Sequence, residues 1–471
     1  MLPEISIDVA IIGAGTAGLY ALREVRRAGR SFLLIDHGPL GTTCARVGCM
    51  PSKVALHAAG LWQSRQALPA IGVSGSEALQ LDKTTTWAEL RKQRDRFTAS
   101  ATNKARTAAG EQLIEGRVRF VEPTLLEVET AQGRVRVHAR AVIIATGSRP
   151  QVPAWLDSVA DRMVTTDELF ELPELPQRIG VLGLGAVGLE MGLALSRLGV
   201  EVTAAGGNSL AGIDDPQVAE RAIKAFSEEM PLWLGPPASV EPLEKGLLLR
   251  SGERATEVDL LLVAIGRRPN TDDLNLADAG FTLGERGDPL FDPATLQLGK
   301  WPVFIAGDAN GQRALMHEAA DEGAIAGYNA ARGLSRRFRR KVPLAIAFST
   351  PDVAAVGARL SQLDPSRIIV GSASGEANGR LRILGGEHSL LNIYADIESG
   401  RLLGASLLCV AGEHLAHQLA WAIQRGETAQ SLLQMPFYHP VVEELLATAL
   451  QEIAKRFATA DGLPMGLVAE D

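Results

Sequence analysis

One pattern occurs twice in this chain of 471 residues: an apolar β-prone run, the motif Gly-x-Gly-x-x-Gly, a helical stretch and a second strand. In the first copy a strand at residues 5–12 leads into the motif, and the second strand ends at Asp36. In the second copy the two strands lie at residues 178–182 and 200–205. The motif glycines are Gly13, Gly15 and Gly18 in the first copy and Gly183, Gly185 and Gly188 in the second.

Each copy predicts a Rossmann-like site for a dinucleotide. The glycines let the backbone approach a pyrophosphate at the helix N-terminus, and an acid at the end of the second strand accepts a hydrogen bond from a ribose hydroxyl. Asp36 fits that role in the first copy, whereas Gly206 stands at this position in the second. Gly188 favours NAD there, but NADP stays open because no acid or arginine directly follows the strand. The nearest candidate acids are Asp214 and Asp215.

The rest of the chain predicts further strands and a separate C-terminal unit. Residues 87–106 indicate a polar helix with a solvated face, and the basic run 336–341 indicates an exposed linker. From residue 342 onward, short β-prone runs followed by helices predict an α+β domain. Further buried strands are predicted at residues 141–145, 260–265 and 303–306.

Composition restricts the partners. The 47 Lys and Arg residues against 55 Asp and Glu residues give a net charge of −8, which disfavours a nucleic-acid partner. Apolar runs stay short of the roughly 20 residues of a membrane span, and the N-terminus lacks the basic and apolar regions of a secretion signal. We therefore expect a cytoplasmic globular protein that binds neither nucleic acid nor a membrane.

Cys44 and Cys49 follow the first copy directly. On a regular helix two residues five apart differ by about 7.5 Å in rise alone, beyond the Cα separation of roughly 4.4–6.8 Å in a disulfide. A disulfide would therefore need a distorted turn, for which Gly48 and Pro51 are suitable breakers. Two buried core cysteines are the alternative; a metal site is disfavoured because the neighbouring sequence offers no further ligand pair.

The segment at residues 41–53, GTTCARVGCMPSK, resembles the redox-active segment of the flavin-dependent pyridine-nucleotide disulfide oxidoreductases, most closely that of the dihydrolipoamide dehydrogenases. It departs from the family motif at Thr42, where the family has glycine. The resemblance extends to about residue 457. It implies that Cys44 and Cys49 form a redox disulfide, in which Cys49 stacks against the flavin and Cys44 exchanges with substrate.

The resemblance also implies a flavin site. Lys53 would lie near the flavin N5 and pair with Glu190 of the second copy. Asp308 would face the ribityl chain, and a helix starting near Met316 would direct its N-terminal dipole toward a reduced flavin. The other flavin-site residues implied outside the glycine motif are Thr43, Thr146, Gly147 and Gly266.

The implied fold is α/β, with two Rossmann-like dinucleotide-binding domains for FAD and NAD(P) and an α+β C-terminal dimerisation domain. The expected order is an FAD-binding domain at 1–150, an NAD(P)-binding domain at 151–270, a central return to the FAD domain at 271–341 and an interface domain at 342–471.

Near the C-terminus the run YHPVVEE resembles the family's HPxxxE motif, which assigns His439 as base and Glu444 as its orienting carboxylate. An imidazole that titrates near neutrality can take the proton from a dithiol before it attacks a disulfide. Phe437 and Val441 replace the usual His and Thr of lipoamide-type members, which leaves the disulfide substrate open. In the family the His–Glu pair completes the active site of the partner subunit, so we expect a homodimer.

The resemblance implies oxidation of dihydrolipoamide, carried by a lipoyl-bearing protein, with FAD and NAD⁺ as acceptors. A glutathione-reductase-like enzyme that reduces a small disulfide is the first alternative. A flavin-binding scaffold without turnover is the second, and the joint presence of the cysteines, Lys53, His439 and Glu444 argues against it. No metal is expected.

Overall fold

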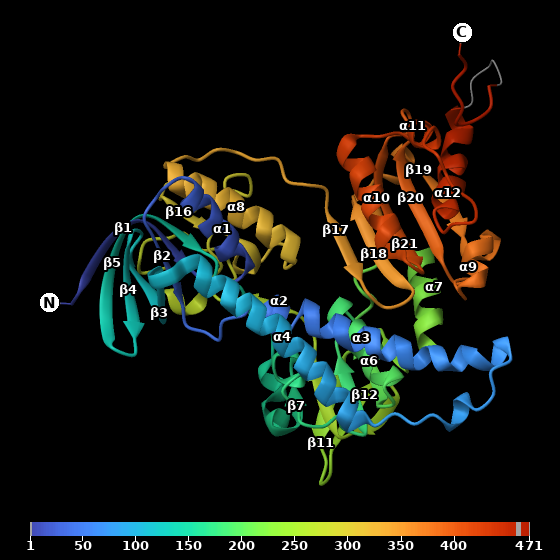
Figure 1. Ribbon diagram of the computed structural model, residues 1–471, viewed down its shortest axis with the longest axis horizontal. Coiled ribbons are helices and arrows are strands. Elements are labelled where there is room, and N and C mark those ends of the chain that lie inside the picture. The colour runs from blue at the N-terminus through green and yellow to red at the C-terminus, as the bar shows by residue number, and fades with distance from the viewer. Residues whose placement is uncertain (1, 458–462, 471) are drawn as a thin grey trace.

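The computed structural model describes residues 2–457 and 463–470, so the first residue of the expected FAD domain and part of the expected C-terminal tail lie outside it. Three groups of strands, each with its own helices, are arranged along the chain (Figure 1). The predicted α/β class with two Rossmann-like units is confirmed, and the domain boundaries at residues 150, 270 and 341 stay predictions. Within the described residues no helix combines the length and apolarity that a membrane crossing requires.

The first unit is a sheet in which β1 pairs in parallel with both β2 and β5. An antiparallel meander of β3, β4 and β5 adjoins it, and β16 adds in parallel to β5. Its members are β1 Glu4–Ile12, α1 Thr16–Arg27, β2 Phe32–Asp36, β3 Leu113–Glu122, β4 Leu125–Thr130, β5 Gly133–Ile144, β16 Val303–Ile305 and α8 Met316–Arg332.

Helices α1 and α8 cross this sheet side by side at unusually short range. A Cβ on Gly323 would lie 2.2 Å from the Ala17 carbonyl oxygen, and one on Gly327 would lie 2.5 Å from that of Ala21. The small residues on both helices therefore allow the central return of the chain to pack against the first glycine motif.

The second unit is an all-parallel sheet in the order β10-β9-β8-β14-β7, with a three-stranded antiparallel meander beside it. The short pair β6 and β15 connects the two units. The second unit and this connecting pair consist of β6 Ser148–Pro150, β7 Met163–Val164, α5 Thr166–Leu169, β8 Arg178–Leu182, α6 Ala186–Arg197, β9 Glu201–Gly206, α7 Pro216–Ser227, β10 Leu232–Leu234, β11 Ala238–Pro242, β12 Leu247–Ser251, β13 Arg254–Val258, β14 Leu260–Val263 and β15 Arg267–Pro269.

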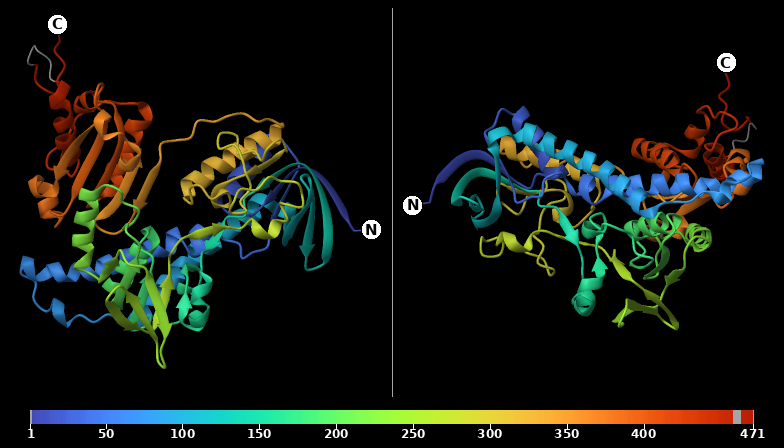
Figure 2. Two further views of the ribbon diagram at one scale, coloured as in Figure 1. Left: turned by 180° about the vertical axis from the view of Figure 1, so that it is seen from behind. Right: turned by 60° about the horizontal axis from the view of Figure 1, so that its bottom comes forward.

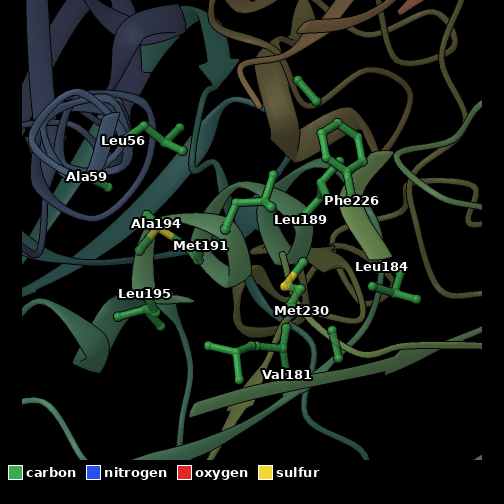
Figure 3. Packing of buried hydrophobic residues seen from close by; sticks show 14 of the residues in the cluster. Leu56, Ala59, Val181, Leu184, Leu189, Met191, Ala194, Leu195, Phe226 and Met230 are labelled. Atoms are coloured by element: carbon green, nitrogen blue, oxygen red, sulfur yellow. The ribbon is translucent and has the colours of Figure 1, made fainter. Parts of the chain in front are cut away.

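Helices α2 (Thr43–Arg46), α3 (Cys49–Ser64) and α4 (Lys83–Ala109) run between the two units (Figure 2). Leu56 and Ala59 of α3 pack against α6 in the largest apolar core cluster (Figure 3). Helix α4 is longer than predicted, and its face is not wholly solvated: Trp87 is fully buried, and buried Arg94 pairs with Glu171 and Asp95. Tertiary packing therefore gives this polar helix a buried side.

The C-terminal unit is an antiparallel sheet in the order β17-β18-β21-β20-β19, flanked by helices. The basic run before it is mostly exposed as predicted, but Arg340 is tied to buried Glu318 and Glu322 of α8. The C-terminal unit consists of β17 Leu344–Ala347, β18 Asp352–Gly357, β19 Ile368–Ser374, α9 Gly379–Ile383, β20 Leu390–Asp396, β21 Leu402–Cys409, α10 Gly412–Arg425, α11 Ala429–Leu433 and α12 Glu444–Ala454.

Candidate active site

The two cysteines of the first unit lie on either side of a helix break. Cys44 belongs to α2 and Cys49 begins α3, and Gly48 between them has φ −120° and ψ −113°, outside the helical region. A Cβ on Gly48 would lie 3.1 Å from the Thr43 carbonyl oxygen, so glycine permits this close return of the chain. The distorted turn that a disulfide requires is therefore present. Pro51 does not form the break, because it lies in the first turn of α3, where a missing N–H costs little.

Thr42 carries the local strain of this segment. Its φ of 62° lies in the region that favours glycine, the residue that the related motif has at this position. The Thr42 side chain compensates in part, because its hydroxyl accepts a hydrogen bond from the Ala45 amide at 3.1 Å and caps α2.

The two free thiols differ in acidity. A hydrogen bond from Cys44 lowers the pKa of Cys49 to about 7; burial opposes this change, and the nearby Lys53 charge supports it. The same hydrogen bond, together with burial, raises the pKa of Cys44. In the reduced protein near neutral pH, the thiolate is therefore placed on Cys49.

The predicted pair Lys53 and Glu190 is brought together from α3 and α6. The Lys53 Nζ lies 2.7 and 2.9 Å from the two carboxylate oxygens of buried Glu190. Phe348, at the start of the C-terminal unit, donates its amide to the same carboxylate at 3.0 Å, and its ring centroid lies 4.6 Å from Nζ. Three parts of the chain thus fix the lysine one helical turn after Cys49.

The first glycine motif forms an open backbone cradle at the N-terminus of α1. Gly13 has φ 107°, and a Cβ there would lie 2.2 Å from the Ala145 carbonyl oxygen, whereas a Cβ on Gly15 would meet no atom within 4 Å among the described residues. Asp36 ends β2 as predicted, and its carboxylate accepts from the Ala14 and Gly38 amides at 2.6 and 2.7 Å. Each of these oxygens keeps a second lone pair for a ribose hydroxyl.

The other residues expected around the flavin come from several elements of the first two units. The Thr146 hydroxyl is buried and has no hydrogen-bond partner among the described residues. Asp308 accepts from the Ser148 hydroxyl at 2.7 Å, and Ser148 accepts from Arg267 at 2.8 Å. Thr43 begins α2, Met316 begins α8, Gly147 follows β5 and Gly266 follows β14. An orphaned hydroxyl and an open glycine cradle are what a bound dinucleotide would complete.

The second glycine motif repeats the first in its backbone. Gly183 donates to Ala205 at 2.7 Å, as Gly13 does to Ile35, and a Cβ on Gly188 would meet the Gly183 carbonyl oxygen. Gly185 stands at the N-terminus of α6 with open space beside it. The backbone geometry that would receive a second pyrophosphate is therefore repeated in this unit.

His439 and Glu444 meet at the start of α12. The His439 Nδ1 lies 2.9 Å from Glu444 Oε1, and the Val441 amide donates to the other oxygen at 3.2 Å. Both hydrogen bonds lower the pKa of Glu444, with His439 as the larger cause. The carboxylate thus orients the imidazole and leaves its Nε2 directed to solvent, since the side chain is 79% exposed.

The chain does not bring this imidazole to its own cysteines. The C-terminal unit with α12 lies well apart from α2 in Figure 1, and the views of Figure 2 agree. The two thiols and this imidazole therefore lie at different places on one chain.

Three residues of this site were not expected from the sequence. Ser148 and Arg267 connect the flavin side to β15, and Phe348 covers Lys53. Arg267 directly follows the predicted flavin-site residue Gly266, and Ser148 directly follows Gly147, but nothing in the sequence indicates which residues they contact. Within the described residues no group of three or more His, Cys, Asp or Glu side chains could hold a metal ion.

Comparisons with known proteins agree with this geometry. Residues 7–323 match the family model described as pyridine nucleotide-disulphide oxidoreductase, and residues 343–450 match its dimerisation domain. A mercuric reductase from Streptomyces lividans is 30% identical over 471 residues, covering 96% of this chain and 96% of that protein. A dihydrolipoyl dehydrogenase from Thermus scotoductus is 30% identical over 463 residues, covering 95% of this chain and 98% of that protein. Among solved structures, the flavoprotein disulfide reductase RclA from Escherichia coli gives a TM-score of 0.82 at 24% identity, covering 95% and 99% of the two chains.

Proposed function

Because the chain belongs to the pyridine nucleotide-disulphide oxidoreductase family, we propose that it oxidises a dithiol, dihydrolipoamide, and transfers the electrons to a nicotinamide coenzyme. Enzymes of this family depend on FAD and use a pyridine nucleotide. The dimerisation domain supports a homodimer in which each subunit supplies its His439–Glu444 pair to the thiols of the other.

The proposed exchange uses the two cysteines and the imidazole. His439 takes the proton from one substrate thiol, and the resulting thiolate attacks the Cys44 sulfur of the oxidised pair. The Cys44–Cys49 bond breaks, and Cys49 leaves as the thiolate that its low pKa favours. The second substrate thiol then attacks the substrate sulfur bound to Cys44 and closes the substrate disulfide; the proton of this second thiol passes to Cys44, which is released as a thiol.

Two electrons have then moved from the substrate to the cysteine pair. A bound FAD would supply the two-electron redox chemistry that connects the reduced cysteine pair with a nicotinamide coenzyme. The chain's own residues hold the groups in place: the Gly13–Gly18 cradle and Thr146 receive the flavin nucleotide, and Lys53 is fixed by Glu190 beside Cys49.

The observation that carries the proposal is the hydrogen bond between His439 and Glu444. A flavin scaffold without turnover has no need for an imidazole oriented by a carboxylate on an exposed surface. Phe437 packs against the C-terminal core and supplies no second imidazole. Deprotonation of the dithiol therefore depends on His439 alone.

The thiol assignment predicts a spectroscopic difference between two variants of Cys44. In Cys44→Ser and Cys44→Ala the Cys49 thiolate stays free, and we expect a long-wavelength charge-transfer absorbance against FAD without prior reduction. Serine keeps a hydrogen-bond donor to Cys49 and alanine removes it, so the pKa of Cys49 should be higher in the alanine variant. A pH titration of the absorbance band should therefore have its midpoint at higher pH in Cys44→Ala than in Cys44→Ser. Equal midpoints would contradict the hydrogen bond from Cys44 as the main cause of the low pKa of Cys49.

Substrate identity is tested by steady-state assays of the holoenzyme. We expect turnover of dihydrolipoamide with NAD⁺, and of lipoamide with NADH in reverse, to exceed turnover of glutathione disulfide by at least about tenfold in kcat/KM. Mercuric ion is the third substrate to test, because two relatives are named for it. Preferred use of glutathione disulfide or of mercuric ion would replace dihydrolipoamide in the proposal.

A further inference from the structure

The two units with glycine motifs can be compared at the end of their second strands, where an adenosine ribose would be recognised. In the first unit Ile12 pairs with Ile35, and Asp36 follows as the last residue of β2. In the second unit Leu182 pairs with Ala205, and Gly206 follows as the last residue of β9. The two strand ends are thus equivalent in register.

The same register makes Ala14 equivalent to Leu184. The Ala14 amide donates to the Asp36 carboxylate at 2.6 Å, and its methyl side chain leaves room for that carboxylate. At the second site a Cβ on Gly206 would lie 2.9 Å from the Leu184 nitrogen and 3.0 Å from its Cγ. The space that holds a carboxylate in the first unit is therefore closed by Leu184 in the second.

Leu184 is held firmly in this place. Its side chain is 2% exposed and belongs to the core cluster around α6 and α7, as Figure 3 shows. Its carbonyl oxygen also accepts from the Ala211 amide at 2.7 Å, which draws the loop after β9 over it. Leu184 is therefore part of the packed core and cannot swing aside to admit an acidic side chain.

The two nearest acids are committed elsewhere. Asp215 is buried, caps α7 and accepts from Tyr394 and Asn392 of the C-terminal unit. Asp214 accepts from the amide and hydroxyl of Ser361, both at 2.9 Å. Sequence proximity suggested these residues as substitutes for the missing acid, and the structure assigns both to contacts with the C-terminal unit.

The segments that border the strand end carry no charge of either sign. Residues 184–187, 207–213 and 233–237, all described by the structure, contain no Asp, Glu, Lys or Arg. The guanidinium of Arg359 comes within 4.0 Å of a Cβ position on Gly212. These three segments are thus uncharged themselves; Asp214 and Asp215 follow the second of them, and the Arg359 guanidinium is the positive group beside Gly212.

We infer that the second nucleotide site has lost the carboxylate that reads the ribose 2′-hydroxyl, that Leu184 fills its place, and that the chain binds the nicotinamide coenzyme with or without a 2′-phosphate. The inference rests on the proposed use of this unit for a nicotinamide coenzyme. A carboxylate favours the free hydroxyl and repels a phosphate, so its absence removes both effects together. The NAD preference expected from Gly188 is then weak.

Direct binding tests the inference separately from turnover. Titration calorimetry of the FAD-loaded protein with ADP-ribose and with its 2′-phosphate should give dissociation constants within about tenfold, or 1.4 kcal/mol, of each other. A larger difference in either direction, or failure of both ligands to bind, would overturn the inference. Binding of both without dihydrolipoamide turnover would count against the proposed function only.

A pair of variants at Gly207 tests where the ribose lies. A Cβ on Gly207 would meet no atom within 4 Å among the described residues, so a side chain fits there. Gly207→Asp adds a charge beside the strand end, and we expect it to weaken binding of the 2′-phosphate form about tenfold relative to ADP-ribose. Gly207→Asn has the same shape without the charge and should leave that ratio unchanged. Equal ratios in the two variants would show that the ribose does not lie at this edge.

Discussion

Replacing Cys49 with serine is expected to abolish dihydrolipoamide oxidation. Serine cannot form the disulfide that receives the substrate's electrons, and loss of a reacting nucleophile costs on the order of 10⁴–10⁶-fold in turnover. The charge-transfer absorbance should disappear as well, because the thiolate with a pKa of about 7 is on this residue. NADH oxidation by small artificial acceptors takes electrons from the flavin without the cysteines, so it should remain.

Cys409 provides the matched control. This third cysteine lies in β21, fully buried, and burial raises its pKa to about 12. We expect Cys409→Ser to keep dithiol turnover within about twofold, even if the buried hydroxyl lowers stability by about 1–3 kcal/mol. Survival of the absorbance band in Cys49→Ser would show that the roles of the two thiols are reversed. Loss of the artificial-acceptor activity would show instead that the flavin is no longer held.

The parts of the fold that could be predicted from sequence are those with local causes. Strands that pass straight into Gly13 and Gly183 end where positive φ values of 107° and 108° require glycine. Strand β3 was not predicted, since four of its ten residues are charged and Phe120 is its one fully buried residue. The buried side of α4 was missed for the opposite reason: Trp87 and Arg94 acquire their partners from residues about 80 positions away.

The candidate site, like the fold, was predictable from sequence only where its features have local causes. Spacing alone left the state of Cys44 and Cys49 open, and only the family resemblance implied the contact between Lys53 and Glu190, which are 137 residues apart. Nothing in the sequence indicated that Leu184 fills the place of a carboxylate, because a leucine after a buried strand looks like an ordinary core residue. A sequence states which side chain is absent at Gly206, but the structure is needed to show what fills the space.

The largest effect outside the cysteines is expected at His439. If it takes the proton from the incoming dithiol, His439→Ala should slow dihydrolipoamide oxidation by roughly 10²–10⁴-fold, the usual contribution of a positioned general base. Artificial-acceptor activity should stay unchanged, because that reaction bypasses the dithiol. Stopped-flow reduction of the holoenzyme by dihydrolipoamide measures the affected step directly.

Variants of Glu444 and of its neighbour Glu443 distinguish a catalytic from a structural role of His439. Glu444 holds the imidazole through a single 2.9 Å contact, and glutamine can still accept that hydrogen bond, so Glu444→Gln should cost less than His439→Ala. Glu443 precedes it at the start of α12, where consecutive side chains point about 100° apart, and Glu443→Gln should have no effect on the step. A graded series, in which His439→Ala is slowest and Glu443→Gln equals the parent enzyme, follows only if the imidazole acts on substrate and Glu444 acts through it. Equal, mild losses in all three variants would remove the base from the mechanism and favour a flavoprotein that binds partners without dithiol turnover.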